Sequence, residues 1–320
     1  MKVLISGAGL VGCHTANELV QGGHEVWFYD LNPNTKYVEA IAGKKGVKVI
    51  QGDLLDLPNL IRAMKEAKPA VVVHTAGFIG GQVSRPPYRG IQTNIMGSTN
   101  IFEASQLTGV KRVVHVSTFG VYDWEHISRG PVKENFPCWG DSFYHATKIA
   151  NELLIGAYGG YYNFETVVIR PASVYGPGHY RGGSGGGRNM DDLARTCLGE
   201  GPILIYEKRV GANDFVYAKD IGRGVALGCT VKEATGKTFN IGSGDVYTPD
   251  DFFNVLRKLL PKREISIVKD VGGGIEGHSR IKLDITQSKR VLGYSPKYPL
   301  VKGFRDYLDV LRGVDLGSIR

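Results

Sequence analysis

The sequence predicts an α/β protein, with a doubly wound parallel sheet of the Rossmann type and a smaller, discontinuous C-terminal lobe. Three observations predict this fold. Short runs of β-branched and aromatic residues alternate with helical stretches through the first half of the chain. These runs are apolar throughout rather than alternating, as expected of strands that are buried on both faces. A glycine-rich turn joins the first run to the first helical stretch.

Six strands are expected in the first half, at 3–6, 26–30, 48–53, 70–77, 112–118 and 166–171. Helices are expected between them, at 11–22, 58–67, 92–108 and 143–158. Repeated units of this kind give parallel strands with right-handed crossovers.

Beyond residue 172 the pattern becomes irregular. Helices are expected at 189–199, at 248–260 with a cap at its start, and at 301–312, and the glycine-rich stretch 181–188 is expected to be a flexible cover. We therefore expect a cofactor domain of residues 1–172 plus about 211–244. The lobe that binds the substrate, about 173–210 plus 245–320, would cover the carboxyl ends of the strands.

Composition limits the function classes. The 320 residues are 42% hydrophobic and 22% charged, which is ordinary for a soluble globular protein. The net charge of +8 is scattered and forms no basic stripe, so nucleic acid is not an expected partner. No segment resembles a membrane span or a signal peptide, which predicts a cytoplasmic protein without a membrane partner. The cysteines have no metal-site spacing and are expected to be reduced core residues: Cys13, Cys138, Cys197 and Cys229.

The first turn is a candidate dinucleotide site. Gly7, Gly9 and Gly12 fit G-x-G-x-x-G, and the helix that opens near Leu10 and Val11 would place its positive end at a pyrophosphate. Asp30 ends the second strand, where a carboxylate accepts hydrogen bonds from an adenosine ribose and repels a 2′-phosphate. NAD is therefore favoured over NADP, although Lys36 could still reach a phosphate.

Later strand ends carry further candidates for the cofactor site. Asp53 could bond the adenine or could simply cap the helix at 58–67. His74 lies inside an apolar strand and is expected to be a satisfied core histidine. The small residues after it suit a backbone that passes beneath the cofactor. The remaining expected contacts are Asn32, Leu54, Thr75, Ala76, Gly77 and Pro171.

Tyr144-His145-Ala146-Thr147-Lys148 is the candidate catalytic stretch. Tyr144 and Lys148 are four residues apart, so on a helix they share a face. A free phenol has a pKa of about 10, and a nearby ammonium stabilises the phenolate. Thr118 ends the strand 26 residues earlier, where its hydroxyl could bond a substrate oxygen or cap the next turn.

With these motifs the chain resembles an extended short-chain dehydrogenase/reductase of the epimerase/dehydratase family. The matching pieces are the glycine loop, GDLLD, HTAG, the N-x-x-G-x-x-N helix, VSTFGVYD, YHATK, RPASVYGPG, DFVYAKD, NIGSG and LDITQSKRVLGYSP. The resemblance implies that Thr118, Tyr144 and Lys148 form the catalytic triad and that Asp30 binds the ribose. It also implies a supporting role for Asn94, and a homodimer that packs the helices at 92–108 and 143–158 into a four-helix bundle.

Several positions depart from that family's pattern. The glycine loop has one residue fewer between its first two glycines than T-G-x-x-G-x-x-G. Ser173 and Asn213 stand where enzymes acting on nucleotide-sugars have Asn and Arg, which weakens that substrate assignment. Phe119 and Gly120 replace the acidic pair of sugar 4,6-dehydratases, which argues against that reaction.

The substrate side of the predicted site is basic. Arginines on its loops, as a set, favour an anionic or sugar-like small molecule such as a sugar acid or a phosphate: Arg85, Arg89, Arg181, Arg188 and Arg209. Each of these arginines alone would be read as a solvated surface charge.

The leading hypothesis is an NAD-dependent oxidoreductase that acts on a secondary hydroxyl of a sugar-like or hydroxy-acid substrate. Tyr144 would be the base and Thr118 would hold the oxygen. An NAD-dependent sugar or nucleotide-sugar epimerase with tightly held NAD is the alternative. A sensor that binds NAD without turnover, and a flavoprotein, are alternatives from other classes.

Overall fold

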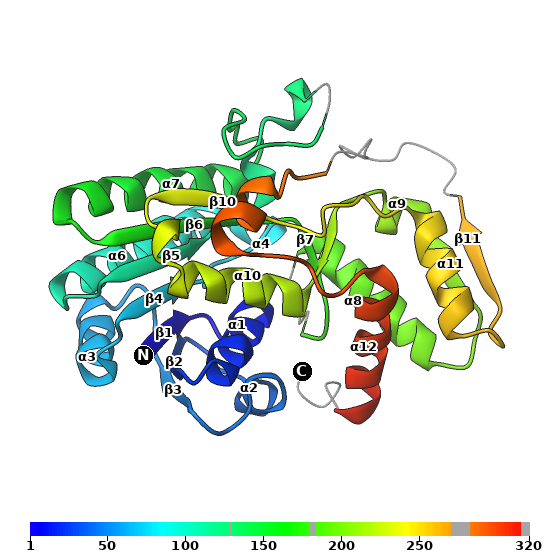
Figure 1. The fold of residues 1–320 in the computed structure, drawn as a ribbon, viewed down its shortest axis with the longest axis horizontal. Coiled ribbons are helices and arrows are strands. Elements are labelled where there is room, and N and C mark those ends of the chain that lie inside the picture. Colours follow the sequence, from blue (N-terminus) through cyan, green and yellow to red (C-terminus); the bar gives the residue numbers. More distant parts are fainter. Residues whose placement is uncertain (128–129, 179–183, 270–281, 315–320) are drawn as a thin grey trace.

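The computed structural model describes residues 1–127, 130–178, 184–269 and 282–314. Its centre is a seven-stranded parallel sheet in the order β10-β6-β5-β4-β1-β2-β3. This order confirms the doubly wound prediction, and Figure 1 shows helices on both sides of the sheet. The strands are β1 (Lys2–Ser6), β2 (Glu25–Asp30), β3 (Val47–Gln51), β4 (Val71–His74), β5 (Arg112–Val116), β6 (Glu165–Pro171) and β10 (Lys237–Ile241).

Each face of the sheet has its own hydrophobic core, because successive side chains of a strand point to opposite faces. In β1, Val3 and Ile5 enter one core, whereas Leu4 enters the other. The first core is covered by α1 (Leu10–Gln21), α2 (Thr35–Ala42) and α10 (Ala218–Thr230). The second is covered by α3 (Leu57–Ala67), α6 (Gly97–Leu107) and α7 (Phe143–Tyr162).

Short helical segments complete this part of the chain. Residues at 92–96 form a π-turn, η1 (Gln92–Met96), which runs directly into α6. The other segments are α4 (Gly81–Ser84), α5 (Pro87–Ile91), η2 (Phe119–Val121), η3 (Trp124–His126), η4 (Lys232–Ala234) and the second π-turn η5 (Ser288–Leu292).

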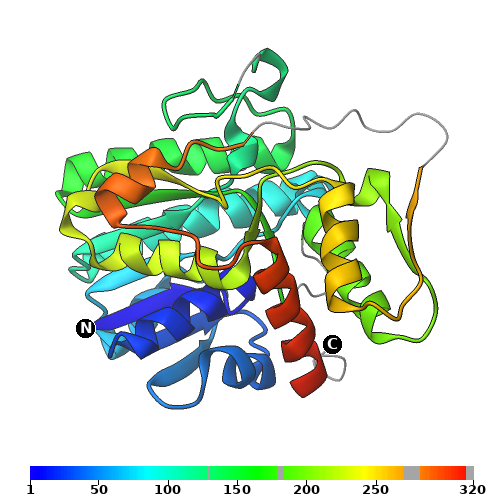
Figure 2. The ribbon, with the colours of Figure 1, turned by 45° about the vertical axis from the view of Figure 1, so that its right-hand side comes forward.

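A smaller lobe lies beside the sheet and has a third core (Figure 2). Its elements are β7 (Ser173–Tyr175), α8 (Gly185–Leu198), β8 (Ile203–Tyr206), α9 (Glu207–Val210), β9 (Phe215–Tyr217), α11 (Pro249–Leu259), β11 (Ile265–Val268) and α12 (Leu300–Gly313). Two parallel pairs, β11 with β8 and β7 with β9, lie outside the main sheet. The expected cap of α11 is present, because Thr248 and Asp251 form a reciprocal capping box.

Two expectations about local structure were wrong, and one of the two alternatives for Asp53 is contradicted. Asp56 rather than Asp53 caps α3, and it accepts the amide of Asn59. The described part of the glycine run is not a loop, because Ser184 caps α8 and residues 185–188 form its first turn. Cys138 is exposed, whereas the other three cysteines are buried as expected. In the described part of the chain, no helix is long and apolar enough to cross a membrane.

Candidate active site

The strand order of the sheet reverses between β1 and β4. The chain runs outward from β1 to β2 and β3, and then returns to β4 on the other side of β1. In open α/β sheets, ligands bind outside the carboxyl ends of the strands at such a point. Because all seven strands are parallel, their ends bring the predicted residues to one edge of the sheet.

The glycine loop follows β1 and passes very close to the end of β4. A Cβ on Gly7, whose φ is +95°, would lie 2.6 Å from Thr75 Oγ1. A Cβ on Gly12 would lie 2.1 Å from the carbonyl oxygen of Gly7. Gly9, the N-cap of α1, has no neighbouring atom within 4 Å of its own Cβ position. The loop is therefore packed from below and open above Gly9, which suits an anion at the start of α1.

Asp30 lies at the end of β2, beside this loop. Its two carboxylate oxygens accept the amides of Ala8 and Asn32, each at 2.8 Å. Asp30 is half-buried, so its carboxylate is fixed and still reachable. The position fits the predicted ribose ligand, and Asn32 contributes its backbone at the exposed turn that follows.

The next two strands end in short polar turns. Asp53 accepts the amide of Leu55 at 2.9 Å, and its backbone carbonyl accepts the Tyr29 hydroxyl at 2.9 Å. The carbonyl of the buried Leu54 accepts Asn100 Nδ2. After β4, the Thr75 hydroxyl donates to the carbonyl oxygen of Ser6 at 2.8 Å. These bonds fix the turns at the carboxyl ends of β3 and β4.

Asn94 lies in the π-turn that precedes α6 and joins two parts of the site. Its side chain pairs with both backbone groups of Phe78, at 2.8 and 3.0 Å. It also donates to Thr147 Oγ1 at 3.2 Å, on α7. A Cβ on Gly77 would lie 3.0 Å from Asn94 Oδ1, so the turn after β4 rests directly on this amide. π-turns are frequent at functional sites.

Thr118, Tyr144 and Lys148 meet at the end of β5. The buried Thr118 accepts the amide of Gly120 at 3.1 Å, so it also caps the next turn. Burial raises the pKa of Tyr144 to about 12, and a hydrogen bond with Thr118 acts in the opposite direction. Lys148 donates to the carbonyl oxygen of Val116 at 2.7 Å. The residues that share a helical face therefore both bond the segment 116–118.

Lys148 carries its charge in a buried position. Burial lowers the pKa of Lys148 to about 8, while the carboxylate of Glu152 opposes this shift. Glu152 itself is paired with the Arg170 guanidinium on β6. Pro171, the last residue of that strand, is buried at the same edge of the sheet.

Four of the five predicted arginines lie among the described residues, and the Asn189 side chain, next to Arg188, donates to the carbonyl oxygen of Arg209 at 2.8 Å. Arg85 and Arg188 are exposed, Arg89 lies over the Phe78 ring, and Arg209 lies over the Tyr206 ring. Arg181 is outside the described residues.

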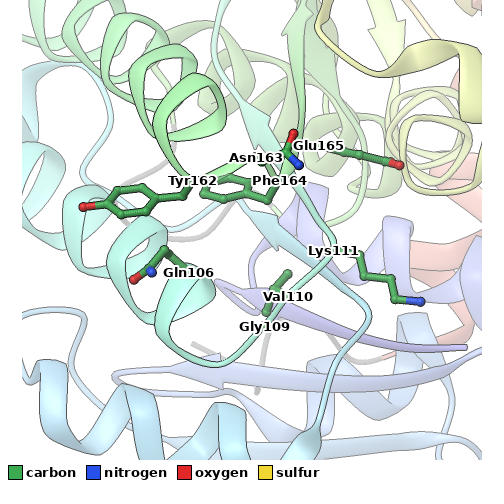
Figure 3. A pocket seen from close by; sticks show the side chains of 8 residues that line it. All are labelled: Gln106, Gly109, Val110, Lys111, Tyr162, Asn163, Phe164 and Glu165. Atoms are coloured by element: carbon green, nitrogen blue, oxygen red, sulfur yellow. The ribbon is translucent and has the colours of Figure 1, made fainter.

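A cavity of about 430 Å³ lies away from this site, at the opposite end of the sheet (Figure 3). It is lined by the last residues of α6 and α7 and by the segments that lead into β5 and β6, with Tyr162 and Phe164 among them. None of the predicted site residues lines it.

Sequence reasoning missed three polar residues near the site. Ser98 and Asn151 are buried and bond one another at 2.9 Å, and Thr147 bonds Asn94. A signal was available, because Asn94 and Ser98 are four residues apart, as are Thr147 and Asn151. Each pair therefore forms a polar patch on one face of a mostly apolar helix.

We expect Asp30→Asn to relax cofactor choice, because the substitution removes the charge that repels a 2′-phosphate while nearly keeping the side-chain shape. The ratio of the Kd for NADP to the Kd for NAD should fall about tenfold. Calorimetric titration of both nucleotides measures this ratio. Asp56→Asn is the matched control, since asparagine caps a helix as well as aspartate does. An unchanged ratio in Asp30→Asn would remove this residue from the ribose site.

Comparison with known proteins gives a consistent result. The family model described as "NAD dependent epimerase/dehydratase family" matches residues 3–242. A UDP-glucose 4-epimerase of Mycolicibacterium smegmatis is 25% identical, and the alignment covers 98% of this chain and 99% of that protein.

Two solved structures are similar over nearly their whole length. The UDP-glucose 4-epimerase of Thermotoga maritima with UDP-glucose has a TM-score of 0.82 and 26% identity, and the match covers 98% of this chain and 99% of that one. The UDP-glucuronic acid 4-epimerase of Bacillus cereus, in complex with UDP-glucuronic acid and NAD, has a TM-score of 0.80 and 25% identity, with the same coverage of both chains.

Proposed function

The chain belongs to the NAD-dependent epimerase/dehydratase family, and from this premise we propose that it oxidises a secondary hydroxyl group of a sugar-like substrate with Tyr144 as the base. The observation that carries the proposal is the meeting of three groups at the end of β5: Lys148 donates to the carbonyl oxygen of Val116 at 2.7 Å, and Tyr144 from the same helix interacts with Thr118. A base, an oxygen-binding hydroxyl and a cation at one strand end form a set suited to proton removal from an alcohol.

NAD would lie across the carboxyl ends of β1 and β4, where the strand order reverses. The open space above Gly9, the close packing below Gly7 and the fixed carboxylate of Asp30 fit its pyrophosphate and ribose. When bound, NAD supplies the acceptor for the two electrons that leave the substrate carbon. The residues proposed to hold it are Gly7, Gly9, Leu10, Val11, Gly12, Asp30, Asn32, Asp53, Leu54, Thr75, Ala76, Gly77, Asn94, Tyr144, Lys148 and Pro171.

Tyr144 must lose its proton to act as the base, and burial alone opposes this because it raises the pKa of the phenol to about 12. Thr118 stabilises the phenolate by a hydrogen bond and would hold the substrate oxygen in the same place. Lys148 is mainly protonated below pH 8 and supplies a positive charge that favours the phenolate further. The three residues thus divide proton removal, oxygen binding and charge stabilisation.

Two outcomes are open to this chemistry, release of the oxidised product or its reduction on the other face. The full-length matches to UDP-sugar 4-epimerases favour a nucleotide-sugar epimerase as the second candidate. Ser173 and Asn213 still lack the groups that the family's nucleotide-sugar enzymes use for a diphosphate. The segments that carry them are adjacent, because the Ser173 amide donates to the carbonyl oxygen of Asp214 at 3.0 Å. Arg85, Arg188 and Arg209, with Arg181, would provide the alternative anion contacts.

A substrate panel separates these outcomes. Purified protein is incubated with NAD and, separately, with UDP-glucose, UDP-galactose, UDP-glucuronate, free sugars and sugar acids. We expect turnover on at least one of these compounds. Stoichiometric NADH identifies a dehydrogenase, whereas exchange between isomers without net NADH identifies an epimerase. If no compound of the panel is turned over while NAD binds, the proposed substrate class is wrong.

We also propose that two copies pair through α6 and α7. Large hydrophobic side chains on these helices and on η1 are exposed, including Leu153 at 71% and Tyr161 at 88%. The others are Met96, Leu107, Phe143 and Tyr162. Monomeric soluble proteins rarely leave such a set uncovered, and a second copy of the same face would bury it.

We propose in addition that the chain is divided into a cofactor domain and a substrate lobe, and that the substrate lobe is built around the third core. We also propose a cytoplasmic location, which suits a protein with four free cysteines.

Leu153→Asp is expected to dissociate the dimer, because it places a charge in the proposed interface, at a side chain that is 71% exposed in one copy. Light scattering should give about 70 kDa for the natural chain, twice the 34.9 kDa of one copy, and half of that for the variant. Leu198→Asp is the control, since Leu198 is an exposed leucine on α8 in the smaller lobe. A Leu153→Asp protein that keeps the mass of the natural chain would rule out this interface.

A further inference from the structure

A buried histidine connects the end of β1 with the start of α6. His74, the last residue of β4, is 1% exposed. Its Nδ1 lies 2.6 Å from the Ser6 hydroxyl oxygen, and its Nε2 lies 2.8 Å from the Ser98 hydroxyl oxygen. Both ring nitrogens are therefore used, which fits the expected satisfied core histidine.

The direction of these bonds follows from the proton on Ser98. Its hydroxyl has one proton and lies 2.5 Å from the carbonyl oxygen of Asn94, to which it must donate. His74 must then donate to Ser98 from Nε2, which leaves Nδ1 as the acceptor for the Ser6 hydroxyl. Burial, and secondarily Lys148, lowers the pKa of His74 to about 3, so this neutral tautomer persists at neutral pH.

The bonds continue from Asn94 to the helix of the proposed catalytic residues. Asn151 on α7 donates to the carbonyl oxygen of Asn94 and to Ser98, each at 2.9 Å. Asn94 Nδ2 in turn reaches Thr147, whose hydroxyl donates to the carbonyl oxygen of Tyr144 at 2.8 Å. The hydrogen bonds therefore form an unbroken series from Ser6 on β1 to Tyr144 on α7.

At the other end, Ser6 is held next to the glycine loop. Its carbonyl oxygen accepts the amides of Thr75 and Ala76, at 3.0 and 2.9 Å, and the Thr75 hydroxyl. Gly7 follows immediately, with the backbone contacts described above. A change in the position of Ser6 would therefore move the first residue of the loop.

His115 provides an internal comparison. It pairs in register with His74 on the neighbouring strand, and the two ring centroids are 5.4 Å apart. It is equally buried, but neither of its nitrogens has a hydrogen-bond partner among the described residues. Two adjacent imidazoles thus share one environment and differ in their bonds.

From this arrangement we propose that His74 is a positioning residue, which aligns the glycine loop with the helix of Tyr144 and Lys148 through hydrogen bonds to Ser6 and Ser98. The proposal rests on the proposed function of Tyr144. Its consequence is that NAD binding at one end and the placement of the base at the other depend on the same imidazole.

The test compares His74→Phe with His115→Phe, since each replaces a buried imidazole by an apolar ring. For each variant, NAD affinity is measured by calorimetry. The values of kcat and KM are measured with the substrate that the panel identifies. His74→Phe should lower kcat about tenfold and weaken NAD binding several-fold relative to His115→Phe, because small misplacements of reacting groups are costly. His74→Gln, whose amide keeps a donor and an acceptor, should recover part of the kcat and part of the NAD affinity that His74→Phe loses.

Smaller variants keep the test decisive if His74→Phe does not fold. Ser6→Ala and Ser98→Ala should each lower kcat. The fold-loss of kcat in the double variant should be smaller than the product of the two single fold-losses, because either change breaks the same series of hydrogen bonds. Equal values for His74→Phe and His115→Phe, or independent serine effects, would overturn the proposal. Tyr144→Phe is assayed in parallel: if it stays active, the proposed function fails, whereas the NAD affinities still decide the role of His74.

Discussion

Replacing Tyr144 by phenylalanine is expected to lower kcat/KM by about 10²–10⁴-fold, the range usual for loss of a general base. The change removes one oxygen atom and keeps the ring in its half-buried position. NAD affinity should fall much less than kcat/KM, because the variant loses only the Tyr144 hydroxyl from the residues proposed to hold NAD, while the glycine loop and Asp30 are untouched. Steady-state kinetics and calorimetric titration of NAD together measure the two effects.

Tyr161→Phe is the matched control for this variant. Tyr161 lies on the same helix and is 88% exposed, so loss of its hydroxyl should leave kcat/KM unchanged. If Tyr144→Phe retained full activity, another group would have to be the base. The alternative of an NAD-binding sensor would gain support only if every activity of the natural chain were absent as well.

Replacing Lys148 by methionine is expected to abolish most activity and to stabilise the protein. The lost charge no longer favours the phenolate, so kcat should fall by about 10²-fold or more. The free energy of unfolding should rise in the variant, although its activity falls. Burial lowers the pKa of Lys148 from 10.5 to about 8, so the natural folded chain carries an unfavourable buried charge at neutral pH.

The pH dependence of that stability gain gives the check. Below pH 8 the natural chain bears the whole cost of the buried ammonium, so methionine should add about 2 kcal/mol, allowing for the bond lost at Val116. Between pH 8 and 10.5 the folded chain releases this proton first, its stability rises relative to the variant, and the gain should fade.

Denaturant unfolding at several pH values measures the difference. Lys111→Met, at an exposed position, should show no such trend. A Lys148→Met protein that is less stable than the natural chain at pH 7 would contradict the expected sign.

Much of the sheet could be predicted because its strands are buried on both faces, which leaves continuous apolar runs in the sequence. The glycine spacing and the four-residue interval between Tyr144 and Lys148 could be read for a similar reason, since each repeats a fixed backbone geometry. Local patterns of this kind assign a residue to a strand end or a helix face. Because the strands are parallel, their carboxyl ends then bring the site residues to one edge of the sheet.

Helix starts and the positions of the arginine side chains could not be predicted, because several residues could take the same role and the sequence does not show which one does. Asp53 and Asp56 are both plausible caps, and the helix begins at the second one. Residues 185–187 are glycines and poor helix formers, yet the cap at Ser184 and the packing of Met190 in the third core hold them in the first turn of α8. The predicted arginines that the structure describes have long, exposed side chains, so no packing rule fixes where their charges lie.

The place of β10 in the sheet bears on how the chain is made. β10 pairs with β6 along five register positions, from Lys237 with Val167 to Ile241 with Pro171, but the whole of α8 to α10 is synthesised between them. Until residue 241 has left the ribosome, β6 remains an open sheet edge with unpaired backbone groups. The nascent sheet is therefore exposed to edge pairing with other chains at β6 until β10 arrives.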